Sequence, residues 1–442
     1  MVLTKQSLAQ TLEFLFICGA FLLISDALTP LLYPIGRVEP DAGDSNVARL
    51  GVATVTYLIA CLLLLPRWRV AVQFLARRPE IVVLAVLPII SAIWAPDFGP
   101  VVRRSLAHAM TLTFCLYVVC RYSADELFDR LILVLAIGMF GSIAIAILYP
   151  EAGVTHGLVN DGAWRGVYGH KAIAGRVCAF AVFICLLHKP ANSLLRSLRW
   201  PTLAATLVVS YMSQSRTSWL LIIAGIAAMI ILAFLRWRRL SQGLRLTICL
   251  IVGAAVAFAA FFSFDDLIEL LGRDSSLSGR TTLWESAIDI ASNRHPWLGS
   301  GYRDFWLGPA ADEIAKYIPQ WVVPNHGHNG YLDTWLELGW VGVALLVFFL
   351  LRNTLALFTR AVYEPMADQW QLLVICVFIF IVNNMSASVA LAHTDLAWVM
   401  VVLASLYSAR SAYARRGYVQ AAPEEWPPLA EAEVESRQPV GV

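Results

Sequence analysis

Residues 127–149 read LFDRLILVLAIGMFGSIAIAILY, and no charged side chain occurs from Leu131 to Tyr149. The hydrocarbon core of a bilayer is about 30 Å thick, and a helix rises about 1.5 Å per residue. A helix therefore needs about 20 apolar residues to cross a bilayer. This stretch predicts a transmembrane helix.

The rest of the chain repeats this pattern. Of its 442 residues, 59% are hydrophobic and 14% are charged, whereas an ordinary soluble domain has about 25% charged residues. This composition excludes a soluble fold. Such long, uniformly apolar runs are typical of helices rather than barrel strands, so we expect an all-α integral membrane bundle. Twelve runs fit, with a count of eleven left open because runs six to eight are crowded: 11–34, 47–65, 80–96, 102–120, 127–149, 171–188, 201–215, 217–235, 246–264, 328–351, 370–389 and 395–410.

The Lys and Arg residues predict the orientation of this bundle. With the N-terminus inside, 19 of them fall on the cytoplasmic side, and eight fall on short outer connections or at outer span ends. Cytoplasmic loops are enriched in Lys and Arg, so both termini of this multi-pass protein are expected in the cytoplasm. No small-residue cleavage site follows the first run, which we expect to be a retained span.

Four regions follow from this topology. Residues 1–264 are predicted to hold transmembrane helices 1–9, and residues 328–410 helices 10–12. Residues 265–327 are predicted to form a large outer loop, which mixes Trp, Tyr, Gly and charged residues. Long structured loops are commonly functional. Residues 411–442 form a cytoplasmic tail with an acidic, Pro-rich stretch, and we expect it to be disordered.

Cationic residues gather at the predicted outer face. The net charge is only +2, which gives no indication of a nucleic-acid-binding protein. Arg offers a bidentate fork to phosphate oxygens, so cations at an outer membrane boundary suit an anionic lipid head group. The alternative is that each one simply extends from a span end toward water. The set consists of Arg103, Arg104, Arg165, His170, Lys171, Arg176, Arg216, Arg273, Arg280, Arg294, Arg303, His326 and His328.

His326 and His328 allow three interpretations: half of a metal site, structural hydrogen bonding, or a general base. A metal site normally needs three or more ligands, and no further suitable ones lie nearby. The eight Cys residues show no paired spacing, so neither a disulfide nor a zinc site is indicated. A neutral imidazole can take a proton from a sugar hydroxyl as its oxygen attacks.

The spacing of the aspartates argues against one class of enzyme. No Asp pair has the i,i+2 spacing of a metal-binding DxD signature, which disfavours a metal-dependent nucleotide-sugar transferase. A diphosphate leaving group can be neutralised by Arg and Lys instead. Asp26, Asn383 and Asn384 are isolated polar residues within apolar runs, where we expect interhelical hydrogen bonding.

Three blocks resemble a known family. They are WRGVYGHK (164–171) with SQSRTS (213–218), GRTTLWESAIDIASNRHPWLGSGYRDFW (279–306), and HGHNGYLDTWLELGWVG (326–342). As a set they resemble the bacterial O-antigen ligase and polysaccharide polymerase superfamily, in particular its succinoglycan-type exopolysaccharide polymerase branch. The ligase pattern of His, ten residues, then Gly is met by His328 and Gly339. The pattern of Arg, three residues, then Leu is met only loosely, because Trp284 follows Arg280 at that spacing.

The resemblance implies a multispan enzyme of the bacterial inner membrane, without cofactors, that uses an undecaprenyl-diphosphate-linked glycan at the periplasmic face. The large outer loop would then be periplasmic. It implies a metal-independent transfer, and a single displacement of the diphosphate would invert the anomeric centre. Arg280 and Arg216 would bind the diphosphate, and His328 would be the base. Arg165, His170 and Lys171 would belong to the donor or acceptor cleft; Arg103, Arg104 and His326 complete the predicted substrate-binding set. Other polysaccharide-assembly proteins are candidate partners.

Three functions remain open on the sequence. The first is a polymerase that joins lipid-linked repeats into exopolysaccharide or O-antigen. The second is a ligase that moves finished glycan to a lipid A core. The third is a secondary transporter, because twelve spans with both ends inside is a common transporter plan. Transporters place ionisable residues near the bilayer midplane on repeat-related helices, and neither feature is found here.

Overall fold

The computed structural model describes residues 5–33, 46–156, 161–236, 280–317, 325–364 and 367–413, with residues 241, 243, 244 and 247. Apart from an isolated bridge between Val154 and Trp164, the named elements in these ranges are helices. Their order is α1 (Lys5–Ile24), α2 (Thr29–Leu32), α3 (Val47–Leu64), η1 (Leu65–Arg67), α4 (Trp68–Arg77), α5 (Pro79–Ser91), α6 (Phe98–Arg121), α7 (Ala124–Leu148), α8 (Pro150–Gly153), α9 (Lys171–Leu187), α10 (Ser193–Met212), α11 (Arg216–Leu235), α13 (Arg280–Arg294), α14 (Pro309–Tyr317), α15 (Gly330–Tyr363), α16 (Ala367–Asn383) and α17 (Leu396–Tyr413).

The all-α membrane fold is supported by the apolar helices. Within the described ranges, four helical stretches are long and apolar enough to cross a membrane: Val47–Arg77, Ala124–Leu148, Arg216–Leu235 and Gly330–Tyr363. Shorter apolar helices include Pro79–Ser91 and Leu396–Ala412. Every predicted run coincides with a helix except 246–264, which lies outside the described residues together with most of the tail. The number of spans and the four-region division stay predictions.

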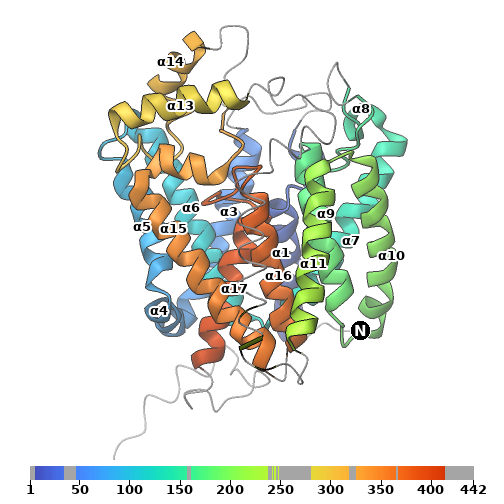
Figure 1. The fold of residues 1–442 in the computed structure, drawn as a ribbon. Coiled ribbons are helices and arrows are strands. Elements are labelled where there is room, and N and C mark those ends of the chain that lie inside the picture. The colour runs from blue at the N-terminus through green and yellow to red at the C-terminus, as the bar shows by residue number, and fades with distance from the viewer. Residues whose placement is uncertain are drawn as a thin grey trace, which may run out of the picture.

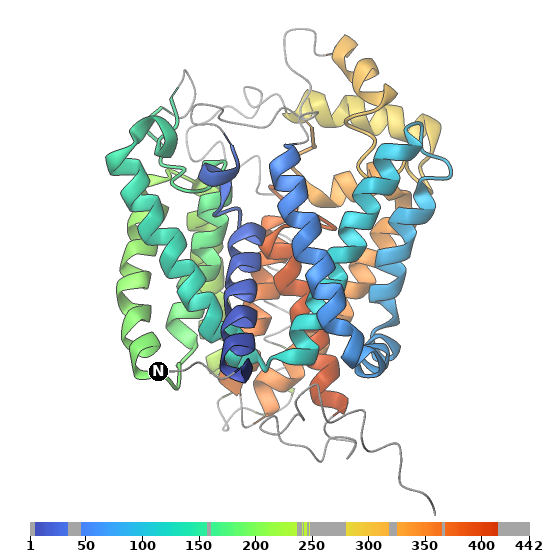
Figure 2. The same cartoon turned by 180° about the vertical axis from the view of Figure 1, so that it is seen from behind.

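Successive long helices run up and down the bundle (Figures 1 and 2). α1 begins at the lower end of Figure 1, where α4 also lies, whereas α8, α13 and α14 lie at the upper end. This alternation follows from short connections between neighbouring spans. The starts of α3, α6, α9 and α11, which carry Arg49, Arg103, Lys171 and Arg216, all lie at the upper end.

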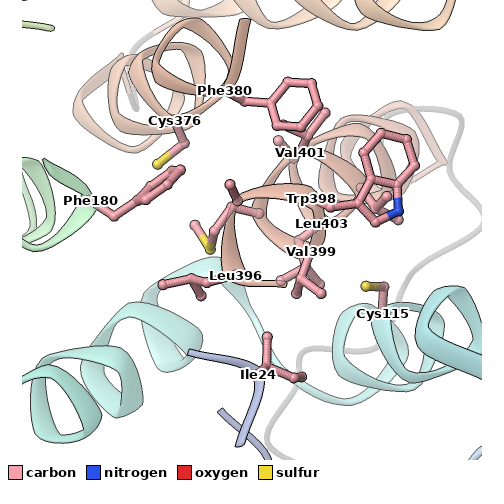
Figure 3. Close-up of a cluster of buried hydrophobic side chains, with 14 of the residues drawn as sticks. Ile24, Cys115, Phe180, Cys376, Phe380, Leu396, Trp398, Val399, Val401 and Leu403 are labelled. Atoms are coloured by element: carbon pink, nitrogen blue, oxygen red, sulfur yellow. The ribbon is translucent and has the colours of Figure 1, made fainter. Parts of the chain in front are cut away.

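α17 is the core of the bundle. Trp398, Val399 and Leu403 are fully buried, and Phe180, Cys376 and Cys115 from three other helices surround them (Figure 3). Its residues from Leu396 to Ala409 are almost continuously buried, because a helix that is apolar on all sides packs favourably within a bundle. The segment before α17 is thereby anchored inside the protein.

The isolated polar residues differ in what they bind. Asp26 lies in the turn between α1 and α2 rather than within a helix. One of its oxygens pairs with Arg49 of α3 at 3.0 Å, and the other accepts from the backbone N–H of Gly169 at 3.1 Å. Asn384 bonds locally instead, since its Oδ1 accepts from the N–H of Val389 and of Ala390. For Asn383, the Nδ2 atom is buried without a recorded partner among the described residues.

Candidate functional site

A pocket of about 750 Å³ opens among α3, α6, the segment around residue 303 and the connection between α16 and α17. Four arginines line it: Arg49, Arg103, Arg104 and Arg303. His326 and His393 also belong to its wall. The sequence-predicted Arg103, Arg104 and His326 thus come together in one cavity from segments more than 200 residues apart.

The other wall of this pocket is apolar. Leu50 and Ala53 of α3 face it together with Leu106 and Met110 of α6. Leu50 and Leu106 are themselves exposed on the protein surface. A cavity with a cationic group at one side and an apolar flank along two helices matches an amphiphilic ligand, whose charged head and hydrocarbon chain need different surroundings.

The pocket arginines differ in whether their side chains already bond to other groups of the protein. Arg49 is paired with Asp26. Arg104 donates to the carbonyl oxygen of Arg303 at 2.7 Å and lies 3.9 Å from Asp304 Oδ1. Arg103 is exposed, and no ion pair or hydrogen bond of its side chain is recorded within the described ranges. Its guanidinium is therefore available to an anion.

The two predicted histidines form a compact pair before α15. Their ring centroids are 4.2 Å apart at an interplanar angle of 80°, and the backbone N–H of His328 donates to Nδ1 of His326 at 3.2 Å. His326 lines the pocket, whereas His328 is not among the residues that line it. Both rings are half-buried. The backbone of His328 has φ of 56°, in the left-handed region that favours glycine.

Gly327, between the histidines, is held at both of its peptide groups. Its N–H donates to the buried carboxylate of Asp333 at 2.9 and 3.1 Å. Its carbonyl accepts from the indole N–H of Trp284 at 2.7 Å. Asp333 also accepts from the indole of Trp306 at 2.8 Å and from the hydroxyl of Ser388. The histidine pair is consequently fixed by α13, α15 and the α16–α17 connection.

Arg280 is the first residue of α13. Its side chain lies outside what the structure describes, as do residues 265–279 of the predicted outer loop. Trp284, four residues further along α13, donates to the carbonyl of Gly327. The Trp in place of the ligase-pattern Leu thus has a defined contact.

The second and third blocks interlock at a break in α15. Gly339 has φ of 66° and ψ of −168°, so the helix is interrupted there. The N–H groups of Trp340 and Val341 donate to the carbonyls of Pro296 and Trp297, at 3.0 and 3.3 Å. In exchange, the carbonyls of Leu336 and Glu337 accept from Ser300 and Gly301, at 3.0 and 2.9 Å.

The first block packs beside the pocket. Arg165 is buried and donates to the carbonyls of Ala152 and Glu151 at 2.8 and 3.1 Å, and His170 caps α9 through a bond from the N–H of Ala172. Lys171 begins α9 and is half-buried, and Arg216 begins α11 and is exposed. None of these four lines the pocket.

Two links join the first block to the pocket. Asp26 accepts from Gly169 and pairs with the pocket residue Arg49. Arg176 of α9 pairs at 2.8 Å with Asp395, another pocket residue. The SQSRTS segment adds support from behind, since the hydroxyl of Ser218 donates to the carbonyl of Gly175 at 2.8 Å.

Backbone strain gathers around the pocket. The described residues other than glycine with positive φ are Asp26, Gln214, Arg303, His328, Leu391 and Thr394. Arg303 and Thr394 line the pocket, and Asp26, His328 and Leu391 each contact or adjoin a residue that does. Such conformations cost about 1–3 kcal/mol each and persist where packing enforces them, commonly at functional sites.

Sequence reasoning missed three pocket residues. Arg49 looked like an ordinary cation at a span end, Glu337 lies inside an apolar run, and His393 stands in no recognised block. Burial, together with the positive charge of Arg303, lowers the pKa of His393 to about 3, so its ring is neutral at neutral pH. The sequence did offer one indication for Arg49: Asp26, an acidic residue within the preceding predicted run, is its ion-pair partner.

The described residues contain no cluster of three or more His, Cys, Asp or Glu side chains arranged to hold a metal ion. Among known proteins, residues 201–347 match the family model described as O-Antigen ligase. The chain is also 28% identical over 268 residues to the exopolysaccharide production protein ExoQ of Rhizobium meliloti (strain 1021). That alignment covers 56% of this chain and 59% of the relative. The family match contains SQSRTS and the second and third blocks.

Proposed function

Because both matches support the O-antigen ligase superfamily, with its exopolysaccharide branch, as the family of this membrane protein, we propose that it is a glycosyltransferase that polymerises lipid-linked oligosaccharide repeats. The donor is an undecaprenyl-diphosphate-linked glycan, and the reaction takes place at the periplasmic face of the inner membrane. Both termini then lie in the cytoplasm.

The observation that carries this proposal is the pocket, in which exposed Arg103 stands beside Arg104 and Arg303 next to an apolar flank. A lipid diphosphate needs these two surroundings at once. Phosphate oxygens accept bidentate bonds from arginine, and a prenyl chain is stable against Leu50 and Leu106 or in the surrounding lipid.

The reaction follows from this arrangement. An acceptor hydroxyl attacks the anomeric carbon as its bond to the phosphate oxygen breaks, and negative charge builds on the departing diphosphate. Preorganised cations in a partly dehydrated site oppose that charge more strongly than water does, so they stabilise the transition state without a metal. One displacement inverts the anomeric centre, which NMR of the product linkage tests against retention.

The remaining predicted residues take roles around this centre. Arg280 and Arg216 supply further phosphate contacts, and His328 and His326 contact the attacking hydroxyl. Arg165, His170 and Lys171 belong to the neighbouring cleft, which Gly169 and Arg176 link to the pocket residues Arg49 and Asp395. These roles rest on the family motifs and on the bonds that hold Gly327 between the histidines.

A ligase that transfers glycan to a lipid A core is the second candidate, favoured by the description of the matching family. A deletion strain separates the two. Loss of polymer with persistence of single lipid-linked repeats indicates a polymerase, whereas accumulation of long carrier-bound polymer indicates a ligase.

Site substitutions test the chemistry directly. Arg280→Ala and His328→Ala should each abolish polymer formation in cells with unchanged protein abundance in the membrane, measured by immunoblotting. Arg280→Lys should restore part of the product, because an ammonium lacks the bidentate fork. Wild-type polymer in both alanine variants would remove these residues from the mechanism.

A further inference from the structure

We infer that Glu337 is a catalytic residue of this pocket, the carboxylate that accepts the proton of the attacking hydroxyl. The inference rests on the proposed glycosyl transfer and adds the group that activates the acceptor. Glu337 lines the pocket together with Arg103, Arg104 and Arg303, so one cavity holds both the cations for a leaving diphosphate and a proton acceptor.

Elimination among the acidic residues leads to Glu337. Asp395, also in the pocket wall, pairs with Arg176 at 2.8 Å and caps α17 by accepting from the N–H of Ala397. Asp333 is saturated by Gly327, Trp306 and Ser388. Among the described residues, the carboxyl group of Glu337 accepts from the backbone N–H of Arg303 and has the charges of Arg303 and Arg104 as electrostatic neighbours, and one accepted bond does not use all of its lone pairs. The remaining lone pairs are available to a substrate hydroxyl.

The break in α15 places this carboxylate. Glu337 lies two residues before Gly339, and its carbonyl accepts from the N–H of Gly301 instead of from the N–H of Val341. A Cβ on Gly299 would lie 2.3 Å from the carbonyl carbon of Glu337, so the two backbones are in direct contact. The segment that fixes the backbone of Glu337 continues into Arg303, which explains why the acid and the cation share one wall.

The proposed step balances. The acceptor oxygen forms a bond to the anomeric carbon of the donor, and the bond from that carbon to the phosphate oxygen breaks. Its electron pair stays on the diphosphate, next to Arg103 and Arg104, while the hydroxyl proton passes to Glu337 and later to water. His326, which also lines the pocket, orients the acceptor. Arginines have only donors, so they cannot accept this proton.

The test is a transfer assay with the full-length protein in lipid nanodiscs and a synthetic prenyl-diphosphate oligosaccharide repeat. Glu337→Gln should lower kcat by about 10²–10⁴-fold, the usual contribution of a general base. The KM for the donor should change little, because glutamine keeps the shape of the side chain and the arginines remain. Glu337→Asp should retain part of the activity, since it keeps a carboxylate displaced by one methylene.

A pH profile separates catalysis from a structural role. A reaction that needs the ionised carboxyl group of Glu337 should speed up as the pH rises. The charged and titratable groups that share the pocket with it are Arg49, Arg103, Arg104, Arg303, His326, His393 and Asp395. Glu337→Gln should lack this pH dependence. Glu364→Gln is the matched control, because Glu364 ends the same helix and pairs with Arg360 at 3.5 Å, far from the pocket.

Each outcome decides one point. Wild-type kcat in Glu337→Gln, or an equal loss in Glu337→Gln and Glu364→Gln, overturns the role of Glu337. A rise in donor KM with unchanged kcat overturns it as well, and assigns the residue to binding. If the wild-type protein catalyses transfer and Glu337→Gln does so equally well, the proposed function stands and only the role of Glu337 is lost. If the wild-type protein, with its fold verified, catalyses no transfer, the proposed function itself is contradicted.

Discussion

Gly327 shows how single residues position the candidate chemistry. A Cβ at this position would meet Asp333 Oδ1 at 2.6 Å, so only glycine lets the loop approach the carboxylate this closely. Asp333 is nearly fully buried. A buried carboxyl group is tolerated when hydrogen bonds satisfy it. Here the donors are the indole N–H of Trp306, the backbone N–H of Gly327 and the hydroxyl of Ser388. The buried Asp333 therefore fixes the position of the histidine pair through Gly327.

Trp284 gives a test at this scale. Trp284→Phe removes the donor to the Gly327 carbonyl, and a hydrogen bond contributes about 0.5–1.5 kcal/mol net. We expect transfer by the reconstituted protein to fall about 2–10-fold, with protein abundance unchanged. Trp219→Phe is the control, because its indole bonds to Ser210 in another part of the upper end. Equal effects of the two substitutions would contradict a specific role of Trp284.

At the scale of elements, the break in α15 is the feature that most shapes the site. Four backbone groups that an unbroken helix would pair with one another pair with residues 296–301 instead. The exchange leaves no member of this set unpaired, so the break costs little in hydrogen bonding. These bonds also join α15 to the segment that follows α13.

Gly339→Ala tests this join. Its backbone conformation is one that essentially only glycine adopts, and a Cβ would lie 2.1 Å from the carbonyl carbon of Trp297. We expect the free energy of unfolding to fall by at least about 2 kcal/mol, seen as a lower Tm in detergent, together with loss of transfer.

Gly51→Ala is the matched control for that substitution. Gly51 lies within α3, and nothing lies within 4 Å of a Cβ added there. Alanine in a helix interior is about 0.5–1 kcal/mol more favourable than glycine, so Tm should stay the same or rise. A similar Tm for Gly339→Ala and Gly51→Ala would show that the break in α15 is not required.

At the scale of the whole molecule, the two ends of the bundle use their arginines differently. At the lower end, Arg410 donates to the carbonyls of Val119 and Tyr122, Arg121 pairs with Glu13, and Arg352 pairs with Glu80. These contacts close helix ends. At the upper end, four arginines line a cavity instead. Arg165 and Arg176 make structural contacts at that end too, so the arginines that line the cavity are a subset of the cations there.

Sidedness is the prediction that belongs to this scale. Arg103→Cys should react with a membrane-impermeant maleimide added to intact cells whose outer membrane admits it, because Arg103 is exposed at the pocket. Arg69→Cys, exposed at the other end, should react only after the inner membrane is permeabilised. The reverse pattern would place the pocket in the cytoplasm and contradict a periplasmic transferase.

The helices of the described residues, and the grouping of cations at the starts of several of them, could be predicted from the sequence. Both are local properties: a lipid-spanning helix must be continuously apolar, and alternating spans place every second connection at the same end. The sequence also determined the family motifs, and three of the predicted substrate-binding residues, Arg103, Arg104 and His326, share the pocket.

Only the tertiary structure decided how these parts meet. The ion pair of Asp26 with Arg49, the bond from Arg104 to the carbonyl of residue 303, and the exchange between residues 296–301 and the broken α15 join segments far apart in the chain. No periodicity encodes such contacts, because they depend on which helix faces pack together. Glu337 acquires a function only through this packing, which brings one acid of an apolar run to the arginines of two other segments.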